Sequence, residues 1–280
     1  MIRLRANRKQ QGFTLIELML SAAIFILLSG AIFGLLAPSQ MQFQTESQLV
    51  SAFEEARLGM DQIVRDVNVA GYPAISNFSQ SPANSSQYAS TPIAWNPGYT
   101  AAPSAPCVIG TAGGGTCVTP GDFDLIVEGN VDGSGVAWIR YQLVGTTLMR
   151  GVVAKGPGAD PANATAPVML PYVLNVMNNA VGVPGVQIAQ IKAIPAYASM
   201  FPGGNPVPVF QFTCDTATGA AAPCNSLPPC PPLAANGNCP QSIRDVSITL
   251  IVMTPQPDAQ TGQLRLVELN GRAHRINPLQ

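Results

Sequence analysis

The feature that most constrains this chain is a predominantly apolar run of 25 residues, Phe13 to Ala37, close to its N-terminus. A helix of about 20 such residues is long enough to cross a bilayer. Four cations precede the run in a short leader: Arg3, Arg5, Arg8 and Lys9. Because basic flanks stay on the cytoplasmic side, the run predicts one membrane span, with the rest of the chain on the far side.

Two details at the start of the run are unusual for a plain membrane anchor. Gly12 separates the basic leader from the first apolar residue, Phe13, and a single carboxylate, Glu17, lies four residues further on. A carboxylate inside a membrane span is costly to bury, so its presence is a functional hypothesis by default. An ordinary secretory signal, with cleavage near Ser29-Gly30-Ala31, and a plain single-pass anchor are the alternatives. Neither a secretory signal nor a plain anchor has a use for the Glu17 carboxylate.

The residues from Gly12 to Met19, GFTLIELM, resemble the prepilin signal of type IV pilins and type II secretion pseudopilins. The resemblance implies that a prepilin peptidase cuts between Gly12 and Phe13 and N-methylates Phe13. It also implies that Glu17 meets the Phe13 amine of a neighbouring subunit. The implied partners are other major and minor pilins or pseudopilins and an inner-membrane assembly platform. The implied location is the bacterial inner membrane, with a periplasmic head, and then a filament.

Glu17 also has a physical role that is independent of the resemblance. Once the leader is removed, Phe13 presents an amine one helical turn away, near the membrane core. Pairing the two charges offsets their desolvation, whereas removing one partner strands the other at roughly 3–5 kcal/mol. The pair can form within one chain or between chains, and the sequence leaves both open. An intersubunit pair would set the axial register.

Residues 13–70 are predicted to form one long helix. Its first part, 13–37, is the membrane half and contains Gly30 and Gly34, a small-residue pair that permits close helix packing. The alternative is that glycine is simply common in such helices. Pro38 is expected to kink or locally melt the helix, because proline lacks an N–H and clashes one turn back.

The second half of the helix, 38–72, is amphipathic. Six apolar residues recur at steps of three and four and share one face, which should pack on a sheet: Leu49, Phe53, Ala56, Met60, Ile63 and Val67. Gly71-Tyr72-Pro73 is a typical helix end. Residues 73–280 then form the predicted head.

Alternating apolar residues predict an antiparallel meander over 123–127, 136–143 and 148–153, and a closing hairpin over 246–253 and 264–273. Further strands are expected over 168–176 and 186–194, and long loops over 73–121 and 195–243. The predicted class is α+β, a helix packed on an antiparallel sheet. This resembles the type IV pilin ladle. Three arginines in the closing region are expected to be solubilising edge charges: Arg265, Arg272 and Arg275.

The six cysteines all follow the membrane run, which indicates disulfides in an oxidising compartment. Sequential pairing is the prediction: Cys107–Cys117, Cys214–Cys224 and Cys230–Cys239. A zinc site is disfavoured because no Cys-x-x-Cys occurs and the single histidine, His274, is distant in sequence. An acidic group is read as turn chemistry, with calcium as the alternative: Asp122, Asp124, Glu128, Asn130 and Asp132.

Charge and chemistry limit the remaining functions. Without the leader, ten cations face fifteen acids, a formal −5, which argues against a nucleic-acid partner. One histidine and no visible nucleophile–base grouping argue against an enzyme, and no cofactor or metal is predicted. Chain length and the helix end at 66–72 resemble PilW-type minor pilins, which prime or cap pili. A J-type pseudopilin is the first alternative, and a filament-tip adhesin or ligand-binding module using the long loops is the second.

Overall fold

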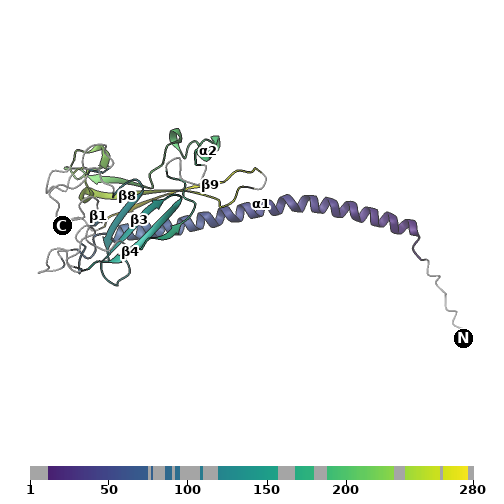
Figure 1. Ribbon diagram of the computed structural model, residues 1–280, viewed down its shortest axis with the longest axis horizontal. Coiled ribbons are helices and arrows are strands. Elements are labelled where there is room, and N and C mark those ends of the chain that lie inside the picture. The colour runs from purple at the N-terminus through teal and green to yellow at the C-terminus, as the bar shows by residue number, and fades with distance from the viewer. Residues whose placement is uncertain are drawn as a thin grey trace, which may run out of the picture.

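The computed structural model describes residues 12–74, 77, 86–89, 92–94, 108–109, 119–156, 168–179, 188–229, 237–258 and 261–276. In these ranges a long N-terminal helix packs on a head built from two antiparallel sheets, and its N-terminal half projects away from the head (Figure 1). The predicted α+β class is confirmed, and the arrangement is consistent with a pilin-like ladle.

The long helix, α1, runs from Leu15 to Val69 without interruption. Thr14 caps its N-terminus, and Gly71, at φ 84°, turns the chain away at the other end. The break expected at Pro38 is not observed, because the residues on both sides are helical and α1 only curves gently (Figure 1). The one backbone hydrogen bond that proline removes is tolerated within this 55-residue helix.

The amphipathic stripe of α1 covers the inner side of the head. Ala56, Met60, Ile63 and Val67 are buried there, whereas Phe53, nearer the membrane run, is 38% exposed. Two glycines allow the close approach: a Cβ at Gly59 would overlap the side chain of Val173, and one at Gly271 would overlap Met60. The stripe therefore packs as predicted, but only over its C-terminal part.

The first sheet has the strand order β1-β2-β3-β4-β5. The predicted meander is confirmed as its centre, where Ile139 pairs with Val127 on one side and with Val152 on the other. The strands are β1 (Ile93–Ala94), β2 (Asp124–Gly129), β3 (Ala137–Val144), β4 (Thr147–Ala154) and β5 (Leu170–Val173).

The second sheet has the order β7-β6-β8-β9 and contains the closing hairpin, β8 (Ile243–Met253) and β9 (Leu266–His274). The prediction that 195–243 is a loop is wrong, because this range holds β6 (Phe210–Asp215) and β7 (Ala221–Pro223). Phe210, Phe212 and Cys214 alternate into the core, so β6 carries a period-two pattern hidden among prolines and glycines.

The strand expected over 186–194 is also wrong, because a short helix, α2 (Ile188–Lys192), lies there. The ammonium of Lys192 is buried, donates to the backbone carbonyls of Asn179 and Asn205, and lies 4.8 Å from the ring centroid of Phe201. Tertiary contacts of this kind outweigh the local strand preference of a five-residue segment.

One of the predicted disulfides, Cys214–Cys224, is present and joins β6 to the segment after β7. Cys239 is also disulfide-bonded. The predicted pairs Cys107–Cys117 and Cys230–Cys239 include residues outside the described ranges, so they remain predictions.

Candidate functional site

The N-terminal half of α1 has no contact with the head. From Gly12 to Gln44 every residue is exposed except Ser29, which is half-buried, and Phe25 and Phe33 are both 71% exposed. Apart from its chain neighbours and the nearby backbone of α1, no atom of the described residues lies within 4 Å of a Cβ built on Gly30 or Gly34. Among the described elements α1 is the one helix long and apolar enough to cross a membrane. An exposed apolar surface of this size requires a bilayer or partner helices.

The helix begins with a reciprocal cap between Thr14 and Glu17. The carboxylate Oε2 of Glu17 accepts hydrogen bonds from the backbone N–H and the hydroxyl of Thr14, both at 2.9 Å. In return, the Glu17 N–H donates to the Thr14 hydroxyl at 3.4 Å. This capping role was missed by the sequence reasoning, although Thr-x-x-Glu before an apolar run is its signature.

The cap brings Glu17 beside the predicted cleavage point. Gly12 and Phe13 lie just before the helix, fully exposed, and Phe13 is 88% exposed. A cut between them would create an amine on Phe13. Phe13 directly precedes Thr14, whose backbone N–H already donates a hydrogen bond to the Glu17 carboxylate. The three predicted residues therefore lie within six residues of one another at the start of α1, and the exposed carboxylate can serve either its own helix or a neighbour.

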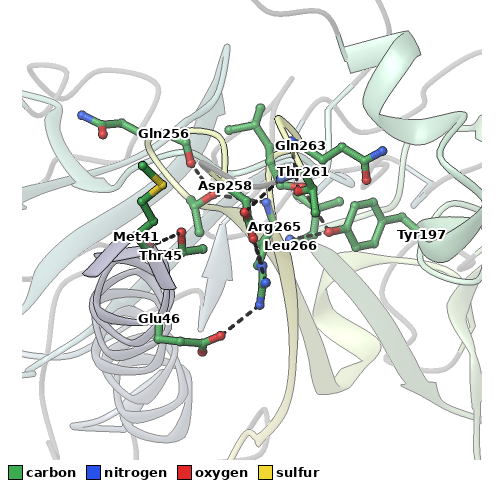
Figure 2. Close-up of polar contacts among 12 residues, drawn as sticks. Met41, Thr45, Glu46, Tyr197, Gln256, Asp258, Thr261, Gln263, Arg265 and Leu266 are labelled. Atoms are coloured by element: carbon green, nitrogen blue, oxygen red, sulfur yellow. Dashed lines mark hydrogen bonds and ion pairs between the residues drawn. The ribbon is translucent and has the colours of Figure 1, made fainter. Parts of the chain in front are cut away.

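Where α1 enters the head, Arg265 joins α1 to the connection between β8 and β9 (Figure 2). Its Nη1 lies 3.1 Å from a carboxylate oxygen of Glu46 on α1, and its Nε and Nη2 donate to Oδ2 of Asp258 at 3.0 and 2.7 Å. Thr45, the first buried residue of α1, donates to the carbonyl of Met41. The Tyr197 hydroxyl donates to the Leu264 carbonyl and accepts from the Leu266 N–H.

This junction corrects the expectation for the three arginines. Arg265 does not lie free in solvent, because it fixes the connection between β8 and β9 to α1. Arg275 is 93% buried, whereas Arg272 keeps a largely exposed side chain and pairs with Asp245. Of the three arginines, Arg272 alone therefore fits the expectation of a solubilising charge at the sheet edge.

A buried carboxylate on α1, Asp66, locks the helix to the first sheet. It accepts hydrogen bonds from the Tyr141 hydroxyl at 2.5 Å, from Arg150 Nη2 at 2.9 Å and from Gln62 Nε2 at 2.6 Å. Burial, reinforced by the Asp66 carboxylate, raises the pKa of Tyr141 far above its usual range, so the hydroxyl stays a donor. Arg150 also lies over the Tyr141 and Tyr172 rings.

Replacing Asp66 by Ala is expected to lower the free energy of unfolding by roughly 3–5 kcal/mol, because it leaves the charge of Arg150 without its buried partner. Chemical denaturation of the full chain in detergent micelles, followed by tryptophan fluorescence, measures the change. Glu46→Ala is the matched control on the same helix. Its ion pair is exposed and should be worth no more than about 1 kcal/mol. Equal losses in the two variants would contradict the assignment of Asp66 as the lock.

The acidic group considered for calcium is occupied by protein partners. Asp124 binds Arg140 and Gln142, and Glu128 forms a buried ion pair with Lys155. Asn130 and Asp132 accept backbone N–H groups of the turn between β2 and β3, which confirms the turn interpretation for these two residues, whereas Asp124 and Glu128 lie in strand β2. In the described residues no group of three or more His, Cys, Asp or Glu side chains could hold a metal ion.

Comparison with known proteins adds one finding. Residues 7–33 match the family model of the prokaryotic N-terminal methylation motif. No curated protein and no solved structure matches the chain. The matched segment contains Gly12, Phe13 and Glu17 and extends into the exposed half of α1. The chain therefore carries a prepilin-type signal, which supports a place among type IV pilins and pseudopilins.

Proposed function

We propose that this protein is a minor type IV pilin, a structural subunit that primes or caps a filament. The observation that carries the proposal is the position of the methylation motif. It covers the start of a helix whose apolar part, which ends at Ala37, is exposed, while the C-terminal part of the helix is packed on a folded head. A chain of this form is held by a membrane first and by other helices afterwards.

The steps assign a role to each predicted residue. The basic leader keeps the N-terminus in the cytoplasm, and the peptidase cuts after Gly12 and methylates Phe13. The apolar half of α1 then moves from the bilayer into a bundle of equivalent helices, where Gly30 and Gly34 permit close packing because their surfaces are open. Glu17 leaves its own cap and pairs with the amine of a neighbouring subunit, which sets the register.

The head supports a minor rather than a bulk subunit. It carries two sheets and an additional segment with α2, and a head of this size resembles those of minor pilins. We infer that the head determines what lies at the end of the filament, while α1 supplies the part shared with other subunits. No catalytic role is assigned to it.

N-terminal mass spectrometry of the membrane-extracted protein tests the proposal. The expected mature terminus is Phe13 carrying one additional methyl group. A native protein that retains Met1, or that begins after Ala31, would overturn it. Recovery of the mature protein from sheared surface filaments, in amounts well below the main subunit, supports the minor-pilin role. Recovery only with a secretion apparatus would assign it to a pseudopilus.

A further inference from the structure

The end of the head that lies beside the C-terminal end of α1 holds a small basic cavity. The backbone N–H of His274, the last residue of β9, donates to the side-chain oxygen of Asn68, which places this region next to the helix end. The cavity measures about 310 Å³ and is lined by Asp215, Arg244, His274, Arg275 and Ile276. It lies far along α1 from the membrane run, so the bilayer does not cover it.

The cavity has more positive than negative charge. Only ten lysines and arginines follow Gly12 in the sequence, and two of them, Arg244 and Arg275, line this one cavity. Its single carboxylate, Asp215, lies 3.4 Å from Arg244 and is partly exposed. The His274 ring is oriented by Asp245, at 2.7 Å from Nδ1, and is half exposed. One acid thus faces two guanidinium groups.

Arg275 is the group in the cavity wall that has no ion-pair partner among the described residues. It is 93% buried, its Nη1 donates to the backbone carbonyl of Gln241 at 3.0 Å, and its Nε has no hydrogen-bond partner. Among the described residues no carboxylate lies within ion-pair distance of it. Burial lowers the pKa of Arg275, and Asp215 only partly opposes this effect. A buried guanidinium without an ion-pair partner is unfavourable, so this wall favours a bound negative charge.

We infer that this cavity is a binding site for a small oxyanion, a carboxylate or a phosphate. The guanidinium of Arg244 supplies accessible N–H donors for the anion. The fixed positive charge of Arg275 adds electrostatic attraction from the cavity wall. The backbone N–H of Arg275 donates to the carbonyl of Arg244 at 2.9 Å, so the two residues are held side by side. The site is separate from the methylation motif, and its occupancy does not depend on the proposed function.

Isothermal titration of the full chain in detergent micelles tests the site, with inorganic phosphate and with acetate as probes at constant ionic strength. Saturable binding of either probe is expected. Arg244→Gln should weaken the affinity about tenfold, the loss of one charge-assisted hydrogen bond. The matched control is Arg272→Gln, on the same hairpin but outside the cavity lining, which should stay within about twofold of the native affinity.

Two results would overturn the inference. One is the absence of saturable heat with both probes in the native protein, and the other is an equal loss in Arg272→Gln, which would indicate a general effect of positive charge. A preference for acetate assigns the site to carboxylates, such as an acidic side chain or chain end of another protein. A preference for phosphate assigns it to a free phosphoryl group. The Arg275→Lys variant tests the contribution of the buried charge. If the Arg275→Lys protein does not fold, the result for Arg244→Gln decides the test.

Discussion

Replacing Gly12 by Val should leave the leader on the protein, so that no mature form beginning at Phe13 is detected. Gly12 is exposed and non-helical and has no side chain beside the bond to be cut. A β-branched valine adds bulk there and restricts the backbone that a peptidase must accommodate. Intact-mass analysis of membrane extracts measures the ratio of precursor to mature protein, and accumulation of the precursor is the expected result.

The matched control is Gly30→Val, a change of the same size within α1, 18 residues beyond Gly12. Its surroundings in the free chain are open, so processing should continue at the native level. A Phe13 terminus in the Gly12→Val protein would remove the cleavage assignment. Loss of processing in both variants would indicate a general defect in membrane insertion.

Replacing Glu17 by Ala should abolish incorporation into filaments while cleavage after Gly12 continues. The new amine of Phe13 would then lack its carboxylate in the helix bundle, at a cost of roughly 3–5 kcal/mol for each uncompensated charge. That cost corresponds to a reduction of about two to four orders of magnitude in an assembly equilibrium. Immunoblots of sheared filaments, compared with membrane fractions, measure it.

Two further variants separate charge pairing from helix capping. Glu17→Gln retains an acceptor for the Thr14 N–H but loses the charge, so it should assemble as poorly as Glu17→Ala. Thr14→Ala removes the cap at a cost of about 1 kcal/mol and keeps the charge, so it should assemble nearly normally. The reverse pattern would show that Glu17 acts only by starting the helix.

Most of the fold could be predicted because its main elements carry long periodic patterns. The stripe around Met60 and Ile63, the meander and the closing hairpin each repeat over enough residues to define a period. The failures are short elements. β6 lies in a segment rich in proline and glycine, and α2 has five residues, fewer than two helical turns.

In the candidate site too, residues close together in sequence could be predicted and contacts between distant residues could not. Gly12, Phe13 and Glu17 are close together in sequence, so a short motif is sufficient to predict them. The Asp66 lock could not be found, because its partner Arg150 is 84 residues away and the carboxylate lies beside apolar neighbours on α1. The clamp between Glu46 and Arg265 spans 219 residues and has no sequence signature either.

The continuity of α1 has a geometric consequence for any assembly. The helix runs unbroken through Pro38 and is fixed to the head at Glu46 and Asp66, so the head cannot turn independently of the apolar half. Each residue of an α-helix contributes about 100° of rotation and ~1.5 Å of rise. The number of residues between Glu17 and Glu46 therefore determines the rotation of the head about the axis of α1 once Glu17 is paired with a neighbouring subunit. A single-residue insertion there would present a different side of the head to whatever lies beside it.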